Sequence, residues 1–349
     1  MSRRQKLILA AFAAAALGAV FFSCMFGSER IPAGVVVSSL QNIFSGNVAF
    51  SSTDDSVRQM IVNEIRLPRA LGALLCGSAL GMAGAALQGL FRNPLADPGL
   101  IGVSSGGALG ALLVFAFGGS IATFLPAFAG SFLLPFAAMA GALFVTLLVL
   151  AVAGMIGHLK IGGMLLVGIA VNSAVAAISG LILHFAADNQ IRTYTFWMLG
   201  GLDRTEWFLL APVALLVVAG ALILPRFARA LDALALGEGE AAAAGVNVAR
   251  LRDVVVWSAA AMVGAAVSVG GMIGFVGLVA PHLVRISCGP GHRFLLPASA
   301  LIGGILLVFA DVLARVVGGA MELPLGVVTA IIGAPFFLGI LLKGERRDV

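Results

Sequence analysis

Ten apolar stretches divide this chain, and most of them approach the ~20 residues that a helix needs to cross a lipid bilayer. A window of about 19 residues separates them from the polar segments between. The predicted spans cover residues 7–26, 67–91, 102–118, 132–153, 163–186, 207–224, 254–272, 274–288, 295–315 and 324–342. The pattern predicts an all-α polytopic membrane protein of about ten transmembrane helices, with residues 1–349 in a single transmembrane domain.

Two parts of this pattern are irregular. Residues 7–26 follow three basic residues, as the apolar region of a signal peptide would. Their apolar run of ~20 residues is longer than the usual 7–15 residues of that region, and no cleavage pattern ends it. We therefore interpret residues 7–26 as the first span. Residues 254–288 carry four glycines between 270 and 277 and Pro281, which predicts a short, broken helix pair.

Glycines at four-residue spacing lie on one face of a helix. Such sets predict close helix packing, although glycine is also simply common in membrane helices. The sets are Gly77 with Gly81, Gly102 with Gly106 and Gly110, and Gly270 with Gly274.

Composition supports a chain immersed in lipid. Only 11% of the residues are charged, against roughly 25% in soluble domains, and 60% are hydrophobic. No soluble catalytic domain fits in this chain. The net charge of +5 comes from scattered basic residues, which argues against a nucleic-acid surface. The three cysteines lie far apart in apolar runs and predict neither a disulfide framework nor a metal site.

The basic residues also predict an orientation. With ten spans and both termini in the cytoplasm, 14 of the 21 Lys and Arg residues fall inside, as the positive-inside tendency requires. The seven that fall outside are Arg30, Arg58, Arg66, Arg69, Arg192, Arg204 and Arg315.

Motifs for catalysis and for ATP binding are missing from the sequence. There is no His-Glu-x-x-His, no Gly-x-Ser-x-Gly and no Cys-x-x-Cys. None of the three lysines follows a glycine, so the phosphate-binding loop is absent and ATP hydrolysis would need a separate subunit. An intramembrane enzyme would lack a paired nucleophile and base.

Two segments interrupt the apolar pattern. The first begins with Arg66 and Arg69, which share one face at the start of a helix. Two X-Pro steps at residues 93–98 end that helix. The two arginines either anchor the helix at the headgroups or form a cationic patch for an acidic partner.

The second segment, residues 225–252, contains a small-residue stretch that favours a short helix ended by Gly245. That helix suits a groove on a partner, unless the segment is only a linker.

The chain resembles the iron-complex and cobalamin permeases, the membrane subunits of type II ATP-binding-cassette importers. The resemblance rests on residues 66–107, 234–245, 274–285 and 311–343. It implies ten helices per subunit in a homodimer, two ATP-binding subunits that carry ATP and Mg, a periplasmic binding protein, and a place in the bacterial inner membrane. No cofactor is implied on this chain.

The same resemblance implies roles for individual residues. The arginines that dock the binding protein fall on Arg66, Arg69 and Arg315. The gate falls on Leu95, Ile161 and Gly162, the last two of which replace small hydroxyl residues of the vitamin B12 permease. Coupling to the ATPase falls on Leu236, Gly237, Glu238, Glu240, Ala241 and Gly245.

Residues 188–197 are similar to the haem permeases of this family. Arg192 suits a propionate carboxylate, and Tyr194 and Trp197 suit a flat macrocycle, unless these aromatic residues belong to an interfacial belt. Haem is therefore the expected substrate, with a ferric siderophore or cobalamin as the alternative. An ion-coupled secondary transporter is the rival class, for which Asp311 is the best candidate. An ion pair of Asp311 with Arg315, four residues later, is the simpler explanation.

Overall fold

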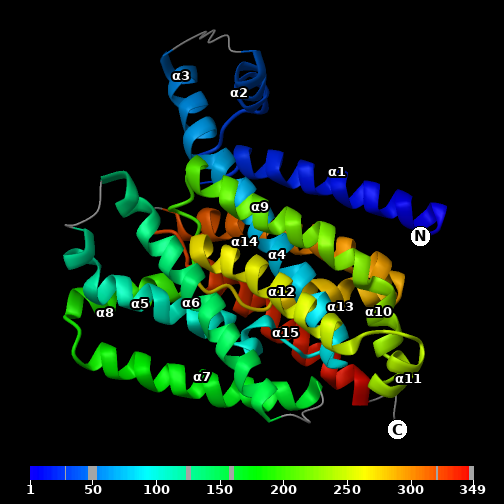
Figure 1. Ribbon diagram of the computed structural model, residues 1–349. Helices are drawn as coiled ribbons and strands as arrows, with labels where there is room; N and C mark the ends of the chain where they lie inside the picture. The colour runs from blue at the N-terminus through cyan, green and yellow to red at the C-terminus, as the bar shows by residue number, and fades with distance from the viewer. Residues whose placement is uncertain (28, 46–52, 123–126, 157–160, 320, 346–349) are drawn as a thin grey trace.

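A computed structural model describes residues 1–27, 29–45, 53–122, 127–156, 161–319 and 321–345 (Figure 1). Regular structure in these ranges is entirely helical, as predicted. Seven helices have the length and composition to cross a membrane, and three further apolar helices are shorter. The helices that correspond to the predicted spans are α1 (Arg3–Met25), α4 (Leu67–Phe91), α5 (Val103–Ala122), α6 (Ala127–Met155), α7 (Ile161–His184), α9 (Trp207–Ile223), α12 (Val248–Gly270), α13 (Val276–Cys288), α14 (His292–Gly318) and α15 (Leu325–Glu345).

Several short helices connect these spans, and most of them were not predicted. Their lengths fall below the window that detects a membrane span. They are α2 (Ala33–Ser45), α3 (Thr53–Met60), η1 (Ile61–Arg66), η2 (Pro98–Ile101), α8 (Asp188–Met198), η3 (Leu224–Phe227), α10 (Ala228–Leu234) and α11 (Glu238–Ala243).

Helix α4 lies at the centre of the bundle, against α14 and α12 (Figure 1). Two glycines bring α4 and α14 together without intervening side chains. A methyl group added to Gly77 would lie 2.2 Å from the carbonyl oxygen of Gly303, and one added to Gly81 would lie 2.2 Å from that of Ser299. The predicted close packing is confirmed here, because only glycine permits this approach.

The other two glycine sets differ from each other. Gly106 of α5 faces the carbonyl oxygen of Gly141 on α6, where a methyl group would lie 2.2 Å away, so this packing is also confirmed. Gly274 has open space around it, so the prediction was wrong for the third set. That glycine instead belongs to the predicted break between α12 and α13, where Gly271 and Phe275 both have positive φ angles of 65° and 68°. Pro281 lies within α13 and does not end it.

The helices define two ends of the bundle. Helices α2, α3 and α8 lie toward one end, which we call the α3 end (Figure 1). The start of α1, with α10 and α11, lies toward the opposite end, which we call the α11 end (Figure 1). An even number of crossings returns the chain to the side where it began. Which end faces the cytoplasm stays a prediction from the basic residues.

Candidate functional site

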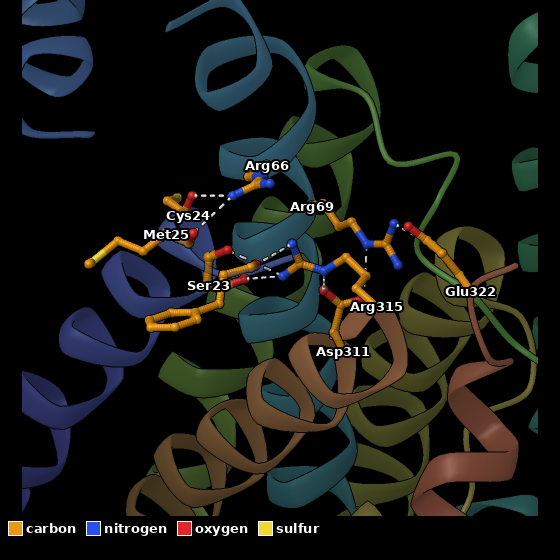
Figure 2. Close-up of polar contacts among 9 residues, drawn as sticks. Ser23, Cys24, Met25, Arg66, Arg69, Asp311, Arg315 and Glu322 are labelled. Carbon is orange, nitrogen blue, oxygen red and sulfur yellow. Dashed lines mark hydrogen bonds and ion pairs between the residues drawn. The ribbon is translucent and has the colours of Figure 1, made fainter. Parts of the chain in front are cut away.

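An ion-pair cluster lies at the α3 end, where α1, α4 and α14 meet (Figure 2). Asp311 accepts from two arginines: Arg69 Nε lies 2.9 Å from its Oδ1 and Arg315 Nε lies 3.0 Å from its Oδ2. Arg69 Nη1 also lies 2.7 Å from Glu322 Oε2. The predicted i,i+4 pair of Asp311 with Arg315 is therefore confirmed, and Arg69 of α4 joins it.

The remaining guanidinium donors bind the end of α1, whose last carbonyl groups have no partner within the helix. Arg315 Nη1 donates to the carbonyl oxygen of Phe26 at 2.9 Å, and its Nη2 donates to the hydroxyl of Ser23 at 2.7 Å (Figure 2). Arg66 Nη1 donates to the carbonyl oxygen of Cys24 at 2.9 Å. The arginines thus tie the end of α1 to α4 and α14.

The burial of these arginines distinguishes them from headgroup anchors, which keep their charged ends in water. The exposed fractions are 5% for Arg66, 7% for Arg69 and 4% for Arg315. A buried guanidinium needs hydrogen-bond partners, and here carboxylates and carbonyl groups supply them. Arg69 and Arg315 pair with the carboxylates of Asp311 and Glu322, whereas Arg66 donates to carbonyl oxygens, so the three arginines leave one excess positive charge.

Helix α8, at the same end, carries the three residues predicted to contact substrate. Tyr194 is buried, and it packs edge-on against Phe115 of α5 with the ring centroids 6.4 Å apart. Trp197 packs edge-on against the same ring at 6.5 Å. Arg192 is exposed, and its guanidinium carbon lies 5.9 Å from the ring centroid of Phe196. The structure therefore does not bring the predicted trio together on one face.

Phe196 is the residue that sequence reasoning missed at this site. Its side chain is 60% exposed and lies under the guanidinium of Arg192. Residues four apart share a helix face, so the spacing of Arg192 and Phe196 was the available signal. Tyr194 and Trp197 hold α8 on α5, and Arg192 and Phe196 form its accessible polar and aromatic face.

The predicted gate residues lie on two neighbouring segments. Leu95 is 48% exposed and lies between α4 and η2, while Ile161 begins α7. Ile161 is buried and Gly162 is exposed. Helix α7 packs closely on η2, since a methyl group added to Gly168 would lie 1.9 Å from the carbonyl oxygen of Leu100.

A polar link fastens α7 to the same segment. Asn172 Nδ2 donates to the carbonyl oxygen of Gly99 at 3.1 Å. The hydroxyl of Ser105, on α5, donates to Asn172 Oδ1 at 2.6 Å. A shift of α7 would therefore strain η2 and α5 together.

The predicted coupling segment forms two short helices, α10 and α11, at the α11 end. The predicted short helix is confirmed, and Gly245 follows it with a φ of +83°. Glu238 Oε1 accepts from the backbone N–H of Ile161 at 3.0 Å, so the coupling segment directly caps the start of α7. Leu236 is 75% exposed, and Gly237 takes a φ of +140° that favours glycine.

The surface of α11 differs from the one expected. Ala241 is fully buried, so it packs within this chain and is not available to a partner. The exposed positions are Gly239, Glu240 and the alanines that follow Ala241. A partner that binds α11 would therefore contact Glu240, Ala242 and Ala243, together with Leu236.

Comparison with known proteins agrees with this architecture. The hemin transport system permease protein HmuU of Yersinia pestis is 40% identical over 85% of this chain and 87% of its own length. The cobalamin import system permease protein BtuC of Halobacterium salinarum is 42% identical over 83% of this chain and 75% of its own. A solved structure described as an inward-facing metal-chelate type ABC transporter covers 97% of this chain and 99% of its own, with 29% identity and a TM-score of 0.82.

These matches define the class of the protein: a multi-pass membrane permease of the ATP-binding-cassette importers. The chain belongs to the FecCD transport family, whose family model matches residues 9–343.

Proposed function

We propose that this permease moves haem across the bacterial inner membrane, with both termini in the cytoplasm. In this proposal it acts as a homodimer, receives haem from a periplasmic binding protein at the α3 end, and is driven by two ATP-binding subunits at the α11 end. The observation that carries the substrate is the exposed pair of Arg192 and Phe196, because a cation beside an aromatic ring suits a carboxylate on a flat macrocycle. The hemin permease relative supports it.

Cobalamin is the second candidate substrate, because the BtuC relative is 42% identical to this chain. The two candidates differ in what Arg192 would contact. Haem has ionised propionates that pair with a guanidinium, whereas a cobalamin importer would not depend on that pair. Proteoliposomes that contain the assembled transporter and a binding protein loaded with either ligand would distinguish them. Stimulation of ATP hydrolysis and uptake by cobalamin alone would overturn the haem proposal.

We expect Arg192→Ala to lower haem uptake several-fold per assembled transporter, because a charge-assisted bond contributes about 1.5–3 kcal/mol. Arg192→Lys should recover only part of the uptake, since it loses the bidentate fork. Arg204→Ala is the matched control, because Arg204 is also exposed and pairs with Asp203. Full uptake by Arg192→Ala, or full recovery by lysine, would remove Arg192 from the substrate pathway and leave it as a headgroup anchor.

Coupling to the ATPase is proposed for α10 and α11 because Glu238 joins them to Ile161 at the proposed gate. Glu238→Ala should leave ATP hydrolysis in place and reduce the substrate moved per ATP, since α7 loses its link to the coupling segment. Asp253→Ala is the matched control, because Asp253 is an acidic residue at the same end that pairs with Arg252. An unchanged transport ratio in Glu238→Ala would contradict the role of this contact.

The surface of α11 gives a second test of coupling. Ala243→Trp enlarges an exposed position and should weaken assembly with the ATPase while the permease itself folds normally. Ala241→Trp overfills a fully buried position and should lower the amount of folded permease instead. Normal ATPase binding by Ala243→Trp would place the ATPase elsewhere.

We also propose that the binding protein docks at the cluster of Arg66, Arg69 and Arg315. Because these side chains are buried, the binding protein would reach them only through the accessible edge of the cluster. The excess positive charge of the cluster supports it, because a partner with acidic lobes would be attracted to this end. Glu322 is its accessible member, with a side chain 38% exposed. A carboxylate of the binding protein would then compete with Glu322 for Arg69.

A further inference from the structure

A basic groove of about 610 Å³ opens at the α11 end, between α10 and the start of α12. Its charged lining consists of Arg226, Arg229 and Arg250, and its lining residues include no carboxylate. Phe227 and Val246 supply apolar surface beside the arginines. The groove is therefore shaped and charged to hold an anion that carries apolar groups.

The three arginines are exposed and, in the part of the chain that the structure describes, none of their guanidinium groups takes part in an ion pair. Carboxylates on the same helices are engaged elsewhere. Asp232 of α10 accepts from His292, and Asp253 of α12 pairs with Arg252 at 2.9 Å. Three unpaired positive charges around one groove repel one another, so an anion between them is stabilised.

Helix α9, which precedes the groove along the chain, carries an exposed apolar stripe. Leu215, Val218 and Leu222 are 70%, 51% and 60% exposed, and their spacing of three and four residues places them on one helix face. Arg226, in η3, and Arg229, in α10, follow the end of α9 along the chain. The groove is therefore preceded by a helix whose exposed apolar face suits acyl chains.

We propose that the groove binds the headgroup of an anionic phospholipid, with its phosphate between Arg226, Arg229 and Arg250 and its acyl chains along α9. Basic pockets at the cytoplasmic ends of membrane helices favour such headgroups by charge. The apolar stripe favours a lipid over an acidic protein segment, because a protein segment bound at the groove would not cover α9. This proposal does not depend on the transported substrate. Because Gly245 of the proposed coupling segment also lines the groove, the test uses the permease without ATPase subunits.

The test measures lipid retained by the full chain. The chain is reconstituted in phosphatidylcholine nanodiscs that contain phosphatidylglycerol, released into detergent and examined by native mass spectrometry. The triple variant Arg226→Gln, Arg229→Gln, Arg250→Gln should retain at least about tenfold less phosphatidylglycerol than the wild type, since it loses all three charges. Arg252→Gln is the matched control and should retain as much as the wild type, because Asp253 already neutralises Arg252.

Several outcomes would overturn the proposal. One is equal retention of phosphatidylglycerol by the wild type and the triple variant. Another is equal retention of phosphatidylcholine and phosphatidylglycerol by the wild type. Displacement of the lipid by inorganic phosphate at equal concentration would indicate a site for free anions instead. A triple variant that keeps the lipid but no longer binds ATPase subunits would assign the groove to a protein. If the triple variant does not fold, the single variant Arg229→Glu is measured in the same way.

Discussion

Two groups of three arginines occupy opposite ends of this bundle, and they differ in almost every physical respect. At the α3 end, Arg66, Arg69 and Arg315 are buried, and they bind carboxylates and the carbonyl groups of α1. At the α11 end, Arg226, Arg229 and Arg250 are exposed around a groove and have no ion pair among the described residues.

The difference shows that an arginine at a helix end has two distinct uses in a membrane protein. A buried and paired guanidinium fixes helices to one another, and losing a partner leaves an uncompensated charge that costs several kcal/mol. An exposed guanidinium contributes little to folding and keeps its charge available for a ligand. Substitutions at both ends test this contrast.

The largest effect is expected from Asp311→Asn. This change removes the carboxylate that Arg69 and Arg315 share, so the free energy of unfolding should fall by about 3–5 kcal/mol. Thermal unfolding of the purified chain in detergent measures it. Asp253→Asn is the control, because that side chain is half exposed in its pair with Arg252, and it should change stability by under about 0.5 kcal/mol. Similar losses in both variants would erase the contrast between the two ends.

A smaller effect is expected from Glu322→Gln. Because this carboxylate is partly exposed, its loss should change stability by about 1 kcal/mol or less. It frees Arg69 for a partner, so association with the binding protein should strengthen at low salt and converge with the wild type at high salt. Binding measured over a salt series tests this, with the exposed Glu64→Gln as control. Weaker association in Glu322→Gln would show that the glutamate itself contacts the partner.

The smallest effect on folding is expected from Arg229→Gln. An exposed guanidinium without an ion pair has little to lose, so the unfolding midpoint of the lipid-free protein should stay within the scatter of surface substitutions, about ±0.5 kcal/mol. Thermal unfolding in a neutral detergent measures this. A loss comparable with that of Asp311→Asn would mean that the groove arginines are structural as well.

The fold was predictable because hydropathy is a local property of the sequence. All ten predicted spans correspond to helices, and the break after Gly270 lies where glycines interrupt the apolar run. Helices α2, α3 and α8 escaped prediction because they are too short for a bilayer-length window. Their role depends on packing against the spans, which the window does not measure.

The sites were predictable only where their chemistry is local. The short helix before Gly245 and the pair of Asp311 with Arg315 both follow from spacing along one segment. The contact of Glu238 with Ile161 joins residues 77 positions apart, and that of Arg69 with Asp311 spans 242. No pattern in the sequence indicates such pairs, and for this reason the burial of the arginines was missed.

The glycine contacts of α4 and α14 also limit how this protein can move. Where Gly77 meets Gly303, backbone touches backbone, and no side chain can change rotamer to absorb a displacement. Sliding one helix along the other by a single residue would drive a Cβ atom into a carbonyl oxygen. The two helices therefore form a fixed frame, and any alternation between open and closed pathways must come from helices outside it, such as α7.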